Sequence, residues 1–137
     1  MRRAGLAILA WFVLCGAAQA APSICPLRSE RPMIEAQLFF GRQIDNRGPV
    51  TMKEWSDFAA TMIAKVFPEG FTMMDGEGAW LDPESKSGIR EDTKIVLIVA
   101  KQSRDLAAKL TKVIDAYKSR FRQHSVGLVT RQVCAAF

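Results

Sequence analysis

The chain has 137 residues, of which 49% are hydrophobic and 24% are charged, and its formal net charge is +5. This length suits one ordinary domain but not two, and the composition excludes disordered, collagen-like and coiled-coil chains. Three cysteines are too few for a disulfide-rich miniprotein, and their odd number needs an explanation if the chain is secreted.

The first 20 residues have the pattern of a secretory signal peptide. Two arginines near the start precede an uncharged apolar run at 5–17, and Ala-Gln-Ala at 18–20 forms a cleavage box. The run is shorter than the roughly 20 apolar residues of a membrane span. We therefore expect residues 1–20 to be removed between Ala20 and Ala21, and the mature chain to be exported to the periplasm or secreted.

Cleavage also accounts for the odd number of cysteines. It removes 20 of the 137 residues, including Cys15 and two arginines, and leaves 117 residues with a net charge of +3. The two remaining cysteines, Cys25 and Cys134, are an even pair, which in an oxidising compartment predicts one disulfide. The reduced net charge gives no indication of nucleic-acid binding.

The mature chain divides into an extended, proline-rich lead-in at 21–33 and a single domain at 34–137, without a linker or an internal repeat. In chain order, the domain predicts a strand at 36–44, a helix at 51–67, a short strand at 71–75 that continues towards 81, a strand at 89–100, a helix at 103–122 and a strand at 125–133. This β-α-β-β-α-β order is that of the ferredoxin-like fold, an α+β architecture. We expect a four-stranded antiparallel sheet with both helices on one face and the first and third strands in its middle.

Local signals support the first helix. Thr51 and Glu54 have the spacing of a capping box, and Val50 and Trp55 occupy the two positions of a hydrophobic staple. Apolar residues then recur at helical spacing until Pro68 ends the helix. The second helix has the same period, with its lysines and arginines off the apolar stripe.

The strands at 36–44 and 89–100 are the most apolar, which agrees with central positions in the sheet. We expect the short strand at 71–75 to continue to Trp80 and Leu81 through a bulge at Gly76 or Gly78. The face of the central strands that the helices leave open still carries apolar side chains, so we expect a second copy of the chain to cover it. The last strand runs antiparallel to the first, which allows Cys134 to approach Cys25 if the lead-in folds back.

The chain has no motif for a cofactor or a metal. His124 is the only histidine, no Cys-x-x-Cys is present, and Asp-Gly-Glu-Gly at 75–78 lacks the Gly-Lys-[Ser/Thr] ending of a phosphate loop. Ser125 adjoins His124 but would point to the opposite face of a strand, so we expect no catalytic pair there. The strand at 89–100 lacks the aromatic residues on which ferredoxin-like RNA-binding domains stack bases, so we expect no nucleic-acid partner.

Several stretches together resemble the bacterial domain-of-unknown-function family 3574 (DUF3574), a family of small exported proteins. They are Leu-Phe-Phe-Gly-Arg at 38–42, Val50 to Phe58, Phe-Pro-Glu-Gly-Phe-Thr at 67–72, Gly-Ala-Trp at 78–80, Arg-Glu-Asp-Thr-Lys at 90–94, the run from Tyr117 to Val126, and Cys-Ala-Ala-Phe at 134–137. His124 and Asp92 depart from the residues that are commoner in the family. The resemblance implies a compact exported domain and no particular activity.

Polar and aromatic residues within these stretches are the candidates for a ligand site, because packing alone explains them less readily than the others. They are Arg42, Trp80, Arg90, Glu91, Tyr117, Arg120 and Gln123. For Trp80 the alternative is core packing. For Arg120 it is favourable electrostatics at the C-terminal end of a helix.

Three functional hypotheses follow. The first is a non-catalytic exported domain that binds a small ligand, for instance an anionic one held by arginine, or a protein partner, and acts as a homodimer through the open sheet face. The second is an enzyme of the dimeric α/β-barrel type with a pocket on that face, using Arg42, Arg90, Glu91 and Tyr117. The third is a structural protein of the cell envelope.

Overall fold

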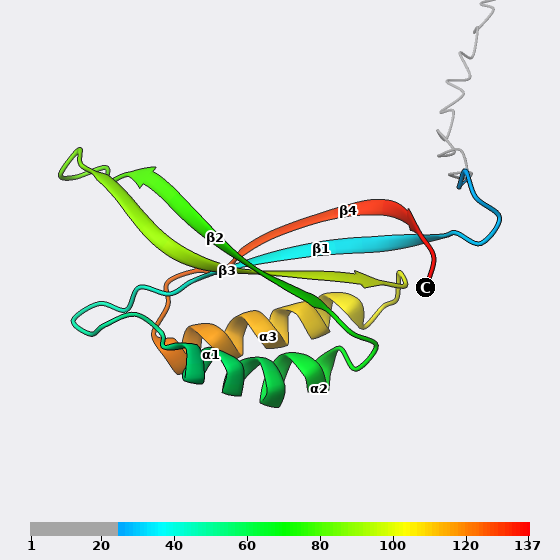
Figure 1. Ribbon diagram of the computed structural model, residues 1–137, viewed down its shortest axis with the longest axis horizontal. Coiled ribbons are helices and arrows are strands. Elements are labelled where there is room, and N and C mark those ends of the chain that lie inside the picture. Colours follow the sequence, from blue (N-terminus) through cyan, green and yellow to red (C-terminus); the bar gives the residue numbers. More distant parts are fainter. Residues whose placement is uncertain (1–24) are drawn as a thin grey trace, which may run out of the picture.

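The computed structural model describes residues 25–137, and the expected signal peptide lies outside this part of the chain. Four antiparallel strands form one sheet in the order β2-β3-β1-β4, and the helices pack on one of its faces (Figure 1). The elements are β1 (Arg31–Gly41), α1 (Met52–Phe58), η1 (Ala59–Ile63), α2 (Ala64–Val66), β2 (Thr72–Leu81), β3 (Gly88–Ala100), α3 (Leu106–Phe121) and β4 (Gly127–Ala135). The predicted α+β, ferredoxin-like fold is therefore confirmed, with β1 and β3 in the middle.

The first strand begins earlier and ends earlier than residues 36–44. It begins at Arg31 because β4 pairs with it as far as Ala135, whereas β3 pairs with it only from Ile34 onward. Pro32 therefore lies where β1 has a neighbour on one side only, a position that tolerates its missing N–H. At the other end Ile44 leaves the sheet and is buried in the core.

The first helical segment runs as α1, η1 and α2 from residue 52 to residue 66, close to the predicted helix at 51–67. Thr51 caps it as expected: the Glu54 N–H donates to Thr51 Oγ1, and the Thr51 N–H donates back to the Glu54 carboxylate at 2.9 Å. The sequence gives no sign of the π-helical turn η1 in its middle. There the Thr61 hydroxyl donates to the Asp57 carbonyl at 2.5 Å, a side-chain bond to a main-chain acceptor in a widened turn.

The capping carboxylate should make the stability of the domain sensitive to acid. Hydrogen bonds from the Thr51 N–H, then from Arg47 and the Thr51 hydroxyl, lower the pKa of Glu54 from 4.5 to about 2. A carboxyl with a lowered folded-state pKa stabilises the fold above its unfolded-state pKa, and this contribution is lost as the pH falls from 4.5 towards 2. We expect Glu54→Gln to flatten the pH dependence of the unfolding free energy in this window. Denaturant unfolding at several pH values measures this, with the exposed Glu69→Gln as the control that should leave the dependence unchanged.

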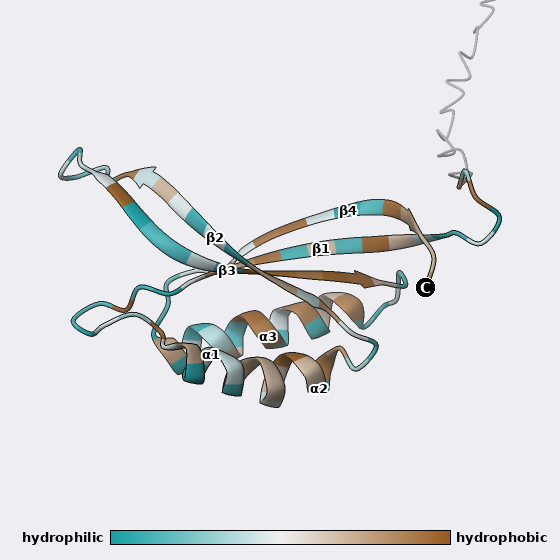
Figure 2. Cartoon of the chain, in the orientation of Figure 1, coloured by the Kyte–Doolittle hydropathy of each residue, from teal (hydrophilic) through white to brown (hydrophobic). Residues whose placement is uncertain are grey.

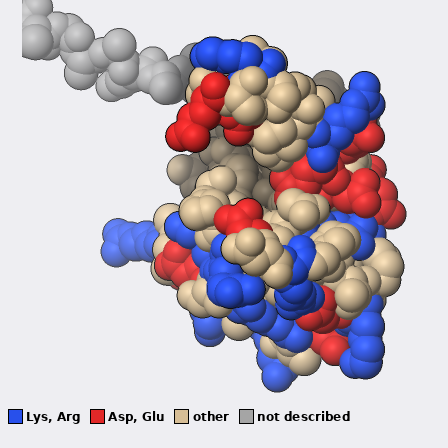
Figure 3. Space-filling view, turned by 90° about the vertical axis from the view of Figure 1, so that its left-hand side faces the viewer, with Lys and Arg blue, Asp and Glu red and all other residues tan. Residues whose placement is uncertain are grey.

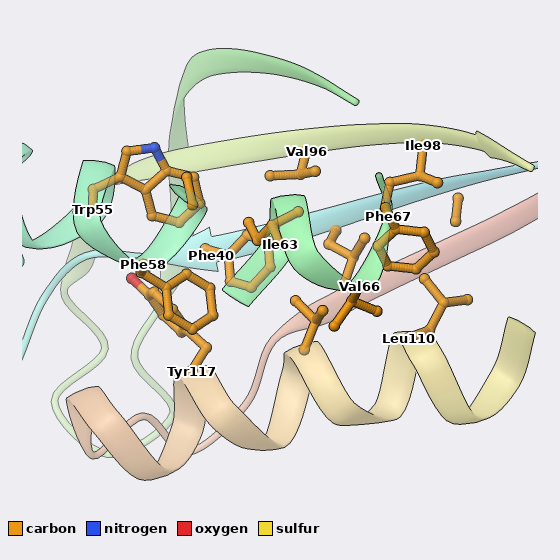
Figure 4. Packing of buried hydrophobic residues seen from close by; sticks show 14 of the residues in the cluster. Phe40, Trp55, Phe58, Ile63, Val66, Phe67, Val96, Ile98, Leu110 and Tyr117 are labelled. Carbon is orange, nitrogen blue, oxygen red and sulfur yellow. The ribbon is translucent and has the colours of Figure 1, made fainter. Parts of the chain in front are cut away.

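Aromatic side chains dominate the core between the sheet and the helices (Figure 4). The Phe40 ring from β1 lies 4.8 Å from the Tyr117 ring and 5.3 Å from the Trp55 ring, measured between centroids. Phe58 from α1 lies 5.1 Å from Tyr117 in an edge-to-face arrangement. Offset and edge-to-face pairs of this kind add to the stability gained by burying the rings.

One disulfide joins the residues ahead of β1 to the end of β4. Cys25 and Cys134 are bonded, as the sequence predicted, and their Cα atoms are 5.5 Å apart. The register of β1 and β4 places Cys134 opposite Pro32, so the chain needs only the turn at 26–30 to bring Cys25 back to the same point. The bond therefore closes the sheet at the end remote from the β2–β3 turn (Figure 1).

The hairpin of β2 and β3 extends well past the helices, and we call its outer part, residues 75–94, the arm (Figure 1). Its ladder is unbroken from the pair Thr72 and Leu97 to the pair Leu81 and Gly88, so the expected bulge at Gly76 or Gly78 is wrong. Glycine is favoured instead by close packing across the strands. A β-carbon at Gly76 would lie 2.9 Å from Ile95 Cδ1.

The face of the sheet opposite the helices remains largely apolar over the body of the domain. The strand register puts Phe39, Ile95, Leu97 and Val99 on this open face, and each of them is only half-buried. Figure 2 shows the hydrophobic second half of β3, which contrasts with the hydrophilic arm. None of the helices in residues 25–137 has both the length and the apolar composition to cross a membrane.

Candidate functional site

A cleft of about 530 Å³ opens on this face at the end of β1. Its walls come from three segments that are distant in the sequence: the end of β1 with the following loop, the β2–β3 hairpin, and the connection from α3 to β4. The lining residues are Phe39, Gly41, Gln43, Asp45, Trp80, Ile89, Arg90, Glu91, Thr93, Gln123, His124, Ser125 and Gly127. Figure 3 looks onto this end of the molecule, where the surface is hollowed below the arm. The volume lies within the range of small-molecule sites, roughly 300–1,000 Å³.

The main chain of Gln43 is held from both sides and forms a rigid wall of the cleft. Its N–H donates to Glu91 Oε1 at 2.6 Å, and its carbonyl accepts a hydrogen bond from Gln123 Nε2 at 2.5 Å. Glu91 also packs against Gly41, where a β-carbon would lie 2.6 Å from Glu91 Oε1. Only glycine allows the carboxylate to approach the chain so closely. Two of the predicted site residues, Glu91 and Gln123, therefore fix the loop that follows β1.

Tyr117 supports the same segment from the core side. Its side chain is fully buried, and its hydroxyl donates to the Gly41 carbonyl at 2.9 Å. Burial raises the pKa of Tyr117 above its usual range, and the negative charge of Glu91 raises it further. Tyr117 thus lies in the aromatic core, and its hydroxyl fixes the end of β1 that lines the cleft.

Removing the Tyr117 hydroxyl should cost stability without changing the core volume. Tyr117→Phe leaves the Gly41 carbonyl without its donor, so we expect the unfolding free energy to fall by about 1–3 kcal/mol. Because the folded-state pKa is raised above 10, the stabilisation is present below pH 10 and is lost as the pH rises further. This alkaline loss should be absent in Tyr117→Phe.

Tyr117 is the only tyrosine of the chain, so its ionisation can be followed directly by ultraviolet absorbance. In the wild-type protein we expect tyrosinate to form only as the domain unfolds. Ionisation of the folded protein near pH 10 would contradict the buried position.

The three predicted arginines do not converge. Arg42 donates through Nε to the Val50 carbonyl at 2.8 Å and lies 3.4 Å from the Asp92 carboxylate, which fixes the other end of the loop. Arg90 lines the cleft, but its guanidinium forms a 2.6 Å ion pair with Glu77. Arg120 lies over the Phe121 ring at 5.2 Å. Of the seven predicted residues the structure therefore brings Trp80, Arg90, Glu91 and Gln123 to the cleft, and leaves Arg42, Tyr117 and Arg120 outside it.

The cleft combines an aromatic surface with carboxylates. Trp80 is 45% exposed, so one side of its ring is available to a ligand. Glu91 and Asp45 supply negative charge, and His124 Nε2 lies 3.4 Å from Asp45 Oδ2 on the exposed rim. Gln43 and Asp45 were missed by the sequence analysis because they lie in a loop with no motif, and only contacts with residues about 50 and 80 positions away give them a place.

Elsewhere, residues 25–137 contain one group of three metal-ligand types in proximity, formed by Cys25, Glu30 and Cys134. The two sulfurs are joined in the disulfide and are not available as thiolate ligands. A second hollow of about 650 Å³ lies at the opposite end of the domain, between the segment from Phe67 to Thr72, the end of β3 and the start of α3. None of the seven predicted site residues lines it.

The fold and the cleft together define a ferredoxin-like domain with a candidate site at one end of its open sheet face. The chain belongs to the family described as protein of unknown function (DUF3574), whose model matches residues 35–137. This match confirms the resemblance seen in the sequence. No curated protein matches the chain significantly.

Solved structures of a phage SAM lyase share the fold. The complex with S-methyl-5'-thioadenosine aligns with a TM-score of 0.58 at 15% identity, covering 77% of this chain and 90% of that one. The apo form aligns with a TM-score of 0.55 at 12% identity, with the same coverage. At these identities the similarity shows a common fold alone.

Proposed function

We propose that this domain binds a small molecule in the cleft at the end of β1, and that binding rather than catalysis is its role. The observation that carries the proposal is the convergence of three distant segments on one cleft, with both main-chain groups of Gln43 fixed by Glu91 and Gln123. A wall held in this way is preorganised, which lowers the entropic cost of binding.

The lining indicates the chemistry of the ligand. Trp80 provides a flat surface for a ring, whereas Glu91 and Asp45 favour a group that is cationic or donates hydrogen bonds. The guanidinium of Arg90, which the sequence offered for an anion, is engaged by Glu77. We therefore expect a flat, positively charged or N–H-rich ligand in preference to an anionic one.

Binding can be tested with defined probes by Trp80 fluorescence and thermal shift. The phage neighbour was solved with S-methyl-5'-thioadenosine, so this nucleoside, cationic S-adenosylmethionine and anionic adenosine monophosphate form a matched series. We expect S-adenosylmethionine to bind most tightly, and Glu91→Gln to weaken it about tenfold, which corresponds to about 1.4 kcal/mol. Trp80→Leu should weaken all three probes.

Leu27→Ala is the control, because Leu27 is also an exposed leucine but lies outside both the cleft and the β2–β3 hairpin. It should leave the affinities unchanged. Equal affinity for the cationic and anionic probes in the wild type, or binding that survives Trp80→Leu, would refute the assignment of the cleft.

The protein should act as a homodimer through the open sheet face. Support comes from Ile95, Leu97 and Val99, which remain only half-buried in a single copy although they lie on a central strand. Light scattering at micromolar concentration tests this. A monomer under all conditions would rule out the dimer while leaving the ligand site open to its own test.

An enzyme is the second candidate, and the same cleft favours it, since it presents the Glu91 carboxylate and the His124 imidazole to one space. Incubation with S-adenosylmethionine, followed by chromatography for new products, distinguishes the two. Turnover that Glu91→Gln abolishes would replace the binding proposal by a catalytic one.

Export belongs to the proposal as well, and its support is the pattern of residues 1–20 in the sequence. Mass spectrometry of the protein from its native cells should find a mature chain that begins at Ala21. An intact N-terminus in the cell would exclude export by this signal.

A further inference from the structure

The arm contributes no side chain to the hydrophobic core. From residue 68 to residue 93 no side chain is buried, whereas the segments on either side supply Phe67 and Val96. At the outer end of the arm Trp80 and Leu81 are 45% and 63% exposed, on opposite faces of the hairpin. A two-stranded hairpin without a covering layer is marginally stable in water. We therefore expect the arm to be stabilised by packing against another molecule.

The arm and the rest of the described chain also carry net charges of opposite sign. The arm contains six acidic and three basic residues, a net charge of −3. The remaining described residues, 25–74 and 95–137, contain eight acidic and fourteen basic residues, a net charge of +6. In Figure 3 the lysines and arginines gather in the lower half, below the arm. Opposite charges on two parts of one chain make each part complementary to the other part of a second copy.

Basic residues from the middle of α3 to just past its C-terminal end provide the complementary surface. Lys112, Lys118 and Arg122 form no ion pair within residues 25–137, and Lys112 and Arg122 are exposed. On the arm, Glu84 is exposed at the tip and its carboxylate has no cationic partner within the same described residues. Within one copy, the carboxylates of the arm cannot pair with these basic residues of α3, because the arm points away from the helices (Figure 1).

We propose that the arm of each copy docks on the basic end of α3 of a second copy, so that two copies hold one another by reciprocal arms. The inference rests on the self-association in the proposed function, and it adds to the open-face dimer a second contact that the dimer needs in order to form. Because Trp80 lies on the arm and also lines the cleft, a second copy seated against the arm closes the open side of the ligand site. We therefore expect the affinity for the ligand to rise when two copies associate.

Sedimentation velocity of the full protein at low and high salt tests the proposal. In the decisive variant, residues 79–90 are replaced by Asn-Gly, a two-residue hairpin turn that keeps Gly78 and Glu91 paired and removes no buried residue. We expect it to fold with an unchanged far-ultraviolet spectrum and to be monomeric where the wild type is dimeric. Raising the salt from about 50 mM to about 500 mM should weaken the wild-type dimer, because screening shortens the reach of exposed charges.

Two matched substitutions distinguish a specific effect of the arm on the dimer from a general effect of exposed leucines. Leu81→Ser on the arm should weaken the dimer about tenfold, as an interface residue worth about 1.4 kcal/mol would. Leu27→Ser, at a leucine that is 61% exposed outside the arm, should have no effect. A dimer that survives arm shortening would overturn the arm proposal and leave the open-face dimer intact. A wild-type monomer at every salt concentration would overturn both.

Discussion

Replacing Cys25 and Cys134 together by serine should lower the free energy of unfolding by about 4–5 kcal/mol. The disulfide closes a loop across a sequence separation of 109 residues, and the chain-entropy model assigns about this much stabilisation to a loop of that length. For a domain of this size such a loss is a large fraction of the total stability. Urea unfolding of the oxidised wild type and of the double variant measures it.

The expected loss has a local signature as well as a global one. Without the bond, the segment from Cys25 to Glu30 is held mainly by hydrogen bonds of its own turn, such as the one from the Glu30 N–H to the Leu27 carbonyl at 3.1 Å. Trypsin should then cleave after Arg28 much faster than in the wild type. Reduction of the wild type with a phosphine serves as the control and should reproduce both effects. Equal urea midpoints for the oxidised wild type and the double variant would show that the bond contributes little.

Phe40→Ala should be among the most destabilising single substitutions in the domain, at about 3–5 kcal/mol. The Phe40 side chain is fully buried, and its ring lies within 6.2 Å of the rings of Trp55, Phe58 and Tyr117. Truncation removes the contacts that join β1 to both helices and leaves a cavity that these large rings can fill only in part. Thermal and urea unfolding of dilute protein measure the loss.

Phe39→Ala is the matched control, since it removes the same atoms from the next residue of the same strand. Phe39 points to the open face, where it is only half-buried and packs against Gly127, with its Cβ 3.2 Å from the place of a β-carbon there. We expect it to cost less than half as much stability in the monomer. Equal losses for the two variants would mean that the two faces of the sheet are equally buried, as in a dimer that persists on dilution.

The parts of the fold that depend on neighbouring residues could be predicted from the sequence. The Thr51 cap needs only Glu54 three positions later, and α3 is marked by the helical spacing of its apolar residues. The start of β1 could not be found in the same way. It depends on pairing with Ala135, more than 100 residues later, and strand pairing over such distances leaves no local pattern.

The candidate site, too, could be predicted only in part from the sequence. Residue type marked Glu91 and Gln123 as unusual, but not that both would bind the main chain of one loop residue, Gln43. Arg90 was a candidate for binding an anion because a free guanidinium suits one. In the folded chain its guanidinium forms an ion pair with Glu77 on the neighbouring strand, which changes the expected ligand from an anion to a cation.

Composition, periodicity and capping by themselves determined the order of the elements, the central strands and the pair of cysteines, and the family was indicated by the resemblance of several stretches. These features depend on short-range spacing or on the simple count of residues. Tertiary structure alone decided which side chains share the cleft, since hydrogen bonds and ion pairs form between atoms brought together by folding. The tertiary structure also showed that the hairpin at 75–94 projects beyond the core, and only because it projects can its acidic residues contribute to association.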